Sequence, residues 1–222
     1  MAVIDDMRQD AKFIRASGFM SSGCHSTLTS SSSLLCLGCF AFYAPKLYKD
    51  YEEKLRALLE KYAHLKRPFD NSVFPACTFN CGARVVTLEH VDSTNVPYGL
   101  CAIFATGAYD PTLGGHLILF NLGLVIQFPP GSTILVPSGT IRHGNTAIQN
   151  HEKRQSFTQY CPGGLLRWVA YGFQAVNAAS DDIKQLLVET HEQRCAHALG
   201  LFSKAGELHN DRVSTFGLRS SH

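Results

Sequence analysis

The chain has 222 residues, of which 45% are hydrophobic and 17% charged, and its formal net charge is +2. This balance predicts one globular domain with flanking segments and excludes a largely disordered chain. The small net charge favours no class of partner, because it creates neither a strong positive nor a strong negative field.

The first residues, MAVIDDMRQD, place two aspartates where a secretion signal has a basic start and an apolar stretch. Nowhere do about 18 apolar residues follow one another without interruption, as a membrane-spanning helix requires. We therefore expect an intracellular protein that does not span a membrane. The eight cysteines are scattered along the chain, so a disulfide framework is not expected.

Residues 1–40 include the serine-biased stretch SSGCHSTLTSSSSLLCLGC, which has neither helical nor alternating periodicity. This stretch predicts a flexible leader. Cys36 and Cys39 form a CxxC motif with His25 nearby. Because no second pair of ligands follows at zinc-finger spacing, the motif favours a structural interpretation over a zinc site.

Two segments have the pattern of helices. In PKLYKDYEEKLRALLEKYAHL, apolar residues recur at positions 47, 51, 55, 58, 59, 62 and 65, and a proline suits the first turn, so an amphipathic helix is predicted from Pro45. A second helix is predicted from about residue 181, because Ser180 can cap it and Asp181 and Asp182 favour its positive end. After about residue 205 the composition becomes polar, and we expect a frayed tail.

Short β-branched or aromatic runs lie between the two helices: GARVVTLEH, LCAIFATG, HLILF, LVIQF, STILVP, QSFTQY and LLRWVAYGF. Turn sequences such as DPTLGG, PPG and PGG separate them. Such closely spaced strands predict a sandwich, a barrel or a jelly roll. The expected organisation is a leader at 1–40, a mainly β domain with flanking helices (α+β) at 41–205, and a polar tail at 206–222.

One motif in this β region suggests a metal site. His90 and Asp92 lie two positions apart at the end of an apolar run, so on a strand they point to the same face. A histidine and a carboxylate inside a β-barrel mouth are two of the three ligands in the two-histidine, one-carboxylate triad of non-haem Fe(II) oxygenases. The motif is common by chance, so it needs a third ligand. His143, at the end of PPGSTILVPSGTIRHGN, is the candidate, although a single loop histidine is more often bonded to backbone.

Two residues on the following β run could bind an anion beside that metal. The planar guanidinium of Arg154 can hold a carboxylate through two hydrogen bonds, and Ser156 follows on the same strand face. Taken singly, an arginine at a strand start is more often a solvated surface charge, and a serine usually has no special role. The ordered series of HxD, glycine-rich turns, PG turn, histidine and Arg-x-Ser favours the metal site.

Several of these stretches together resemble the fungal TET/JBP-like Fe(II)- and 2-oxoglutarate-dependent dioxygenases over about residues 40–175. They are FYAPKLYKDY, RPF, HVDSTN, YGLCAIFATGAYDPTLGGHLILF, FPPGSTILVPSGTIRHGN, RQSFTQY and GGLLRWVAYGF. The resemblance implies a double-stranded β-helix, the jelly roll of cupin-like proteins. It also implies that Fe(II), 2-oxoglutarate and O2 oxidise a methylated base in DNA, most directly 5-methylcytosine to 5-hydroxymethylcytosine, a step of DNA demethylation. The implied partner is DNA with a methylated base, and the implied location is the nucleus.

The resemblance also assigns residues. His90, Asp92 and His143 match the iron ligands, Arg154 matches the arginine that binds the distal carboxylate of 2-oxoglutarate, and Ser156 occupies the matching Arg-x-Ser position.

A base in duplex DNA must leave the stack to react. Asn95, Tyr98, Arg142 and Asn145 are candidates for contacting such a flipped base. His116 could approach the cosubstrate, although a hydrogen-bonded core histidine is the competing interpretation.

Three alternatives remain open on the sequence alone. The same iron chemistry could act on N6-methyladenine or on a small molecule. The chain could be a catalytically decayed, mobile-element-associated copy that binds nucleic acid or a partner. It could also be a cupin-like metal enzyme that does not use 2-oxoglutarate.

Overall fold

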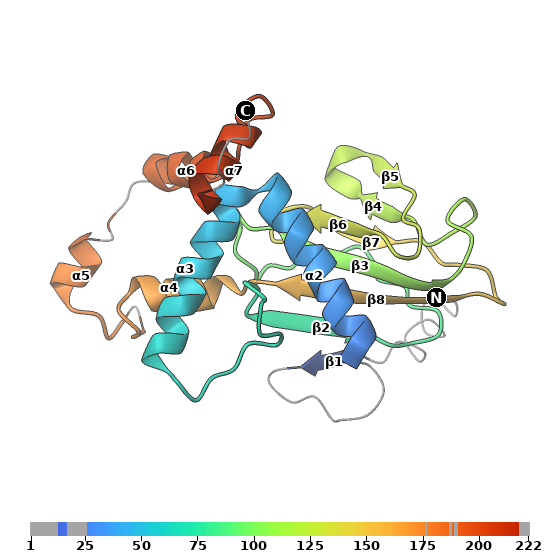
Figure 1. Cartoon of the computed structure of the whole chain (residues 1–222), viewed down its shortest axis with the longest axis horizontal. Coiled ribbons are helices and arrows are strands. Elements are labelled where there is room, and N and C mark those ends of the chain that lie inside the picture. The colour runs from blue at the N-terminus through green and yellow to red at the C-terminus, as the bar shows by residue number, and fades with distance from the viewer. Residues whose placement is uncertain (1–12, 17–25, 176, 187, 189–190, 218–222) are drawn as a thin grey trace.

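The computed structural model describes residues 13–16, 26–175, 177–186, 188 and 191–217 (Figure 1). The strands are β1 (Phe13–Ala16), β2 (Ala76–Asn80), β3 (Cys101–Ala108), β4 (Leu117–Leu119), β5 (Leu124–Ile126), β6 (Thr133–Val136), β7 (His143–Asn145) and β8 (Lys153–Tyr160). The helices are α2 (Ser26–Tyr43), α3 (Pro45–Lys61), the 3-10 turn η1 (Phe120–Leu122), α4 (Gly163–Ala170), α5 (Asp181–Leu186), α6 (His191–Gly200) and α7 (Leu208–Phe216). None of the helices in the described ranges is long and apolar enough to cross a membrane.

The strands form two antiparallel sheets, one in the order β1-β2-β8-β3-β6 and one in the order β5-β4-β7. The extended segment 85–90 pairs with the outer side of β7, through the bridge between His90 and His143 and a hydrogen bond from Asn145 N to Thr87 O. From β2 to β8 the chain therefore passes repeatedly from one sheet to the other. This strand order is a double-stranded β-helix, so the fold is the mainly β jelly roll with flanking helices that the sequence predicts.

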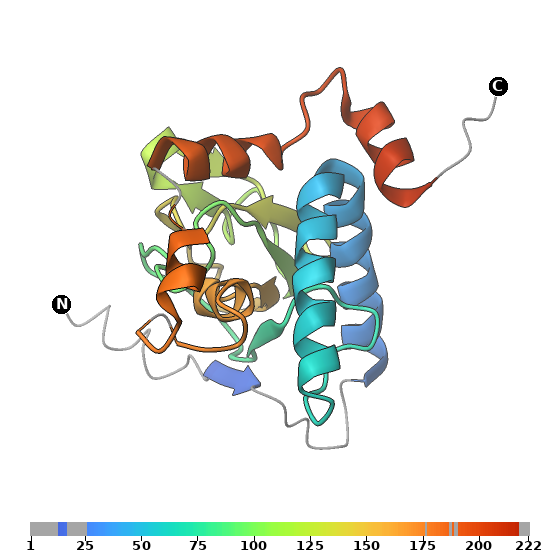
Figure 2. The ribbon, with the colours of Figure 1, turned by 90° about the vertical axis from the view of Figure 1, so that its left-hand side faces the viewer.

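The first sheet separates two apolar clusters. Along β3, Ala102 and Phe104 face a cluster with α2 and α3, whereas Cys101, Ile103 and Ala105 face the second sheet. This alternation follows from the two-residue period of a strand. Figure 2 shows α2 and α3 side by side along one flank of the sheets.

Helix α3 confirms the helix predicted from Pro45. Its proline occupies the first turn, and its buried residues, Leu47, Tyr51, Leu55 and Leu58, form the predicted apolar stripe. α5 begins at Asp181 as predicted, and Ser180 accepts a hydrogen bond at 3.4 Å from the backbone N–H of Ile183.

Helix α2 begins at Ser26, so it includes residues 26–40 of the flexible leader that the sequence predicts at 1–40. Cys36, Leu37 and Phe40 are buried in the core against the first sheet, so the expected boundary at residue 40 falls inside a helix. The sequence shows no periodicity here because the outer face also carries the apolar residues Leu34 and Leu35. Packing on the first sheet, rather than helix propensity, stabilises the helix.

The CxxC motif lies on the same helix. Burial raises the pKa of Cys36 to about 12, which disfavours the thiolate that zinc requires. His25 lies outside the described residues.

Two further segments differ from expectation. The run LLRWVAYGF is not a strand but belongs mainly to α4, where Leu166 is buried on one face. Its apolar residues are too few to distinguish a short helix from a strand by period alone. The expected frayed tail contains α7, which packs on α3 through the rings of Phe216 and Tyr48 and through the ion pair of Asp211 with Lys46 at 3.3 Å.

Candidate metal centre

A cavity of about 820 Å³ lies between the two sheets. Its walls come from β2, the segment 86–95, β3, β4, β7 and β8. The polar and charged residues that line it are Thr78, Asn80, Thr87, Glu89, His90, Asp92, Thr94, Asn95, His143, Asn145, Arg154, Ser156, Thr158 and Tyr160. Polar and charged side chains thus line a cavity that lies beside the apolar cluster of Cys101, Ala105 and Leu119 between the sheets.

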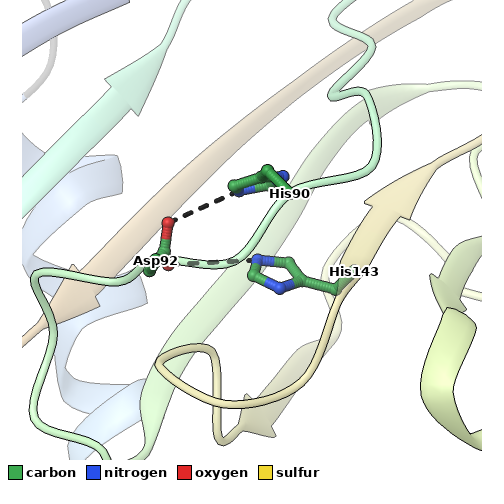
Figure 3. A group of neighbouring side chains, drawn as sticks. All are labelled: His90, Asp92 and His143. Atoms are coloured by element: carbon green, nitrogen blue, oxygen red, sulfur yellow. Dashed lines mark ion pairs between the residues drawn. The ribbon is translucent and has the colours of Figure 1, made fainter.

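Three of the lining residues form one cluster in Figure 3, made of His90, Asp92 and His143. One ligand atom from each residue lies within 4.8 Å of the other two. Backbone pairing places the histidines, because His90 N donates to His143 O at 3.0 Å and His143 N donates to His90 O at 2.9 Å. Asp92 lies two residues beyond this bridge and turns its carboxylate back toward both rings (Figure 3).

The two imidazoles are oriented in the same way. Nδ1 of His90 hydrogen-bonds Leu88 O at 2.8 Å, and Nδ1 of His143 hydrogen-bonds Ile141 O at 2.9 Å. Because Nδ1 donates to a carbonyl, Nε2 of each neutral ring carries the lone pair. These Nε2 atoms lie 3.4 and 3.9 Å from the Asp92 carboxylate oxygens. Two imidazole lone pairs and a carboxylate directed at one point fit a divalent transition-metal ion.

The pKa directions favour the metal-binding forms of Asp92 and His143 but the protonated form of His90. Burial acts to raise the pKa of Asp92, but hydrogen bonds from His90 and Ser138 outweigh it and the pKa of the carboxyl is lowered. The hydrogen bond to Asp92 raises the pKa of His90. Burial lowers the pKa of His143. At neutral pH the carboxylate is thus ionised and the more buried imidazole is neutral, as metal ligands must be.

A buried arginine lies in the same cavity. Arg154 is 2% exposed, and its Nη1 donates to Val85 O at 3.3 Å. Its Nε has no hydrogen-bond partner, and no carboxylate pairs with the guanidinium, among the residues that the structure describes. Burial lowers the pKa of this guanidinium, while the neighbouring Tyr109 opposes that shift. A buried cation without an anion is costly, so this end of the cavity is suited to an anionic ligand.

The backbone geometry that directs Arg154 inward depends on a glycine. Gly107 lies opposite Arg154 in the β3–β8 ladder with a φ of +126°. A Cβ at this position would lie 2.2 Å from Lys153 O. Only glycine therefore permits this approach of the two strands.

Ser156 continues the polar face of β8 from Arg154. It is buried and pairs with Asn80 across the β2–β8 ladder, where Asn80 Nδ2 donates to Ser156 Oγ at 2.9 Å. Thr158 faces Thr78 in the same ladder. Thr78, Asn80, Thr158 and Tyr160 also line the cavity and were not among the residues predicted from the sequence. The alternation in KRQSFTQY, with Arg154, Ser156, Thr158 and Tyr160 two positions apart, is a signal for the last two.

Asn95 and Asn145, two of the four candidate substrate residues, line the cavity. The side chain of Asn145 is engaged by backbone, because its Oδ1 accepts from Thr87 N at 2.8 Å and its Nδ2 donates to Val85 O at 3.2 Å. Asn145 therefore ties the segment 85–90 to β7. Asn95 contacts Asp92, with Nδ2 donating to Oδ2 at 3.2 Å.

The other two candidates lie outside the cavity lining. Tyr98 packs against the α2–α3 cluster, and its hydroxyl accepts from Lys54 Nζ at 3.3 Å. Arg142 is exposed and forms an ion pair with Glu89 at 2.6 Å. His116 hydrogen-bonds Thr146 Oγ1 at 3.1 Å and is likewise not among the lining residues, which agrees with its interpretation as a structural histidine.

No protein-family model matches the chain, and no curated protein matches it. Among solved structures, the chain is similar to NgTET1 in complex with 5mC DNA, with 14% identity, a TM-score of 0.40, and coverage of 73% of this chain and 66% of that one. It is also similar to a viral collagen prolyl hydroxylase from Paramecium bursaria Chlorella virus-1 in complex with 2OG, with 13% identity, a TM-score of 0.34, and coverage of 71% and 82%.

A third similar structure is an oxidoreductase of the 2OG-Fe(II) oxygenase family from Burkholderia pseudomallei, with 23% identity, a TM-score of 0.31, and coverage of 40% of this chain and 44% of that one. The chain thus spans just under two thirds of the length of the TET chain. Because all three TM-scores lie below 0.5, the functional assignment rests on the geometry of the cavity.

Proposed function

We propose that the protein is an Fe(II)- and 2-oxoglutarate-dependent dioxygenase that oxidises a methylated nucleobase in DNA. The observation that carries the proposal is one cavity that contains two features together. At one point the two Nε2 atoms and the Asp92 carboxylate converge, and elsewhere in the same cavity lies the buried guanidinium of Arg154, for which the described residues supply no carboxylate.

Each feature would have one task. His90, Asp92 and His143 would hold Fe(II), and three protein ligands leave coordination positions open for cosubstrate and O2. Arg154 would hold the distal carboxylate of 2-oxoglutarate, with the Ser156 hydroxyl beside it. The requirement for an anion separates this proposal from a cupin-like metal enzyme without 2-oxoglutarate, which has no use for a buried arginine in its cavity.

When bound, Fe(II) and 2-oxoglutarate would allow O2 to act as the oxidant, with one oxygen atom converting a methyl C–H bond into C–OH and the other entering succinate as 2-oxoglutarate loses CO2. The chain contributes orientation and exclusion of water. The Arg154 guanidinium fixes one end of the cosubstrate, and the walls contributed by β2, β4, β7 and β8 shield the reacting methyl group from solvent.

A methylated base, with 5-methylcytosine as the first choice, is proposed on the resemblance of HVDSTN, RQSFTQY and the adjoining motifs to TET/JBP-like enzymes. The size of the cavity, about 820 Å³, supports it, because pockets for small molecules span about 300–1,000 Å³. The polar side chains of Thr78, Asn80 and Thr158 would offer hydrogen bonds to the edge of a flipped base. If DNA is the substrate, the nucleus is where the protein would act.

A small methylated molecule is the second candidate substrate. The observation in its favour is that Tyr98 and Arg142, two of the residues expected to contact a base, do not line the cavity. The iron and 2-oxoglutarate chemistry would be unchanged.

The test is turnover by the purified protein with Fe(II), 2-oxoglutarate and duplex DNA that contains 5-methylcytosine. We expect succinate and 5-hydroxymethylcytosine in equal amounts, and neither from His90→Ala. DNA with N6-methyladenine and unmethylated DNA serve as comparison substrates, because only the true substrate accelerates succinate release. Succinate without a modified base would reject DNA as the substrate, and equal turnover by His90→Ala would reject the site.

A further inference from the structure

We propose that Ser138 and Asn95 are positioning residues that hold the Asp92 carboxylate toward the cation. This inference rests on the proposed function, because it assigns support to one of the three proposed iron ligands. Neither residue is a metal ligand in the proposal.

Asp92 needs support that the histidines do not. The mutual backbone hydrogen bonds of His90 and His143 fix those two residues in the sheet. Asp92 follows the last paired residue of its segment, and its side chain is 32% exposed. A carboxylate beyond the ladder on an irregular segment keeps one position only if other groups hold it.

Asn95 supplies one such group. It lies at the end of a turn in which its backbone N–H donates to Asp92 O at 2.8 Å. Its Nδ2 donates to Asp92 Oδ2 at 3.2 Å and to Ser138 Oγ at 3.1 Å. Both amide hydrogens are therefore engaged, which leaves Asn95 no N–H for a substrate and favours a supporting role over the base contact expected from the sequence.

Ser138 supplies the other group from a distant part of the chain. It is 1% exposed, and its carbonyl accepts from Asp92 N at 2.9 Å. Its hydroxyl accepts from Asn95 Nδ2 and contributes to lowering the Asp92 pKa, against the effect of burial. Ser138 belongs to the turn that leads from β6 to His143 in β7. One short stretch of chain thus supports Asp92 and carries a proposed ligand.

The arrangement has a consequence for coordination. The hydrogen bond from Asn95 to Oδ2 restricts rotation of the carboxylate, which faces both imidazoles. Loss of this hydrogen bond would allow the carboxylate to rotate. Cation affinity and the spectrum of the bound ion would then both change.

The experiment measures Co(II) binding, by calorimetry and by the visible spectrum of the ion, to the full chain carrying Ser138→Ala or Asn95→Leu. Leucine keeps the branched shape and the number of side-chain heavy atoms of asparagine and removes both donors. Thr140→Ala is the control, because it removes an exposed hydroxyl of the same turn, which donates to Pro137 O at 3.2 Å. Circular dichroism and thermal unfolding without metal establish that each variant is folded.

We expect each of the two variants to bind Co(II) about 10–100-fold more weakly than the wild type, with an altered spectrum, and Thr140→Ala to match the wild type. Wild-type affinity and spectrum in either folded variant would overturn the role of that residue. If the wild type itself does not bind one Co(II) in a manner abolished by His90→Ala, the proposed function fails and not the support of Asp92 alone. If one variant does not fold, the other still tests whether its own residue holds the Asp92 carboxylate.

Discussion

His90 and His143 lie opposite each other across two backbone hydrogen bonds, with ring centroids 4.3 Å apart. Residues 53 positions apart in sequence are thereby held with both Nε2 atoms near the Asp92 carboxylate. Two rings this close would repel each other if both were protonated. A divalent cation bound between them would neutralise the Asp92 carboxylate while both imidazole rings remain neutral.

The first prediction concerns this pair. Replacing either histidine by alanine removes one of three donors and should abolish stoichiometric Fe(II) or Co(II) binding, as measured by anaerobic calorimetry. His116→Ala is the matched control, because His116 is also half-buried and hydrogen-bonded but lies outside the cavity lining. Metal binding that is lost equally in the control would show that the effect is unfolding and not ligand loss.

The second prediction concerns Arg154. With metal present, Arg154→Leu should weaken 2-oxoglutarate binding about 10–100-fold, since a hydrogen bond to a charged group contributes about 1.5–3 kcal/mol. The affinity of Arg154→Leu for the metal, measured without 2-oxoglutarate, should equal that of the wild type. Arg142→Leu, an exposed arginine outside the cavity lining, is the control. Unchanged 2-oxoglutarate affinity in Arg154→Leu would favour a metal enzyme that does not use this cosubstrate.

Some elements of the fold can be predicted from the sequence and others cannot. α3 is predictable because Leu47, Tyr51 and Leu55 repeat with the period of a helix and face one core. The β-helix is predictable because β3 and β8 are long β-branched or aromatic runs between turn sequences. α2 is not, since the exposed Leu34 and Leu35 are as apolar as the buried Leu37, so no period marks the helix.

The candidate site is predictable from the sequence only where it consists of local patterns. The HxD spacing and the order of His143 and Arg154 are local patterns. The support of Asp92 by Ser138 and the pairing of Asn80 with Ser156 join residues 46 and 76 positions apart. Such pairs depend on strand register, which a single sequence does not specify.

The third prediction tests whether α2 belongs to the fold. Leu37 is 6% exposed and Leu35 is 53% exposed on the same helix. Leu37→Ala should lower the free energy of unfolding by about 2–5 kcal/mol, and Leu35→Ala should change it by less than about 0.5 kcal/mol. Chemical denaturation measures both. Equal small effects would mean that α2 does not pack on the sheet in solution.

The fourth prediction concerns the buried thiols. Burial raises the pKa values of Cys36, Cys101 and Cys161 to about 12 from an ordinary value of 9.0. In the native protein at pH 8 these thiols should resist a disulfide reagent, whereas the exposed Cys81 should react.

The same shifts fix the sign of a pH effect. Because the thiols ionise near pH 9 when unfolded and near pH 12 when folded, their contribution to stability is complete below pH 9 and is lost as the pH rises above it. Thermal unfolding midpoints measured between pH 7 and about pH 11 should therefore decrease once the pH exceeds 9. Rapid modification of all cysteines at pH 8, or a midpoint that rises with pH, would contradict this packing.

In the proposed enzyme, His90, Asp92 and His143 bind a single cation in the cavity that also holds Arg154. The decisive measurement is an anaerobic crystal structure with Fe(II) and N-oxalylglycine, a 2-oxoglutarate analogue, in which the anomalous signal locates the iron. We predict one iron peak within coordination distance of both Nε2 atoms and an Asp92 oxygen, with the distal carboxylate of the analogue on the Arg154 guanidinium. An iron peak elsewhere, or an analogue that leaves Arg154 without an anion, would contradict it.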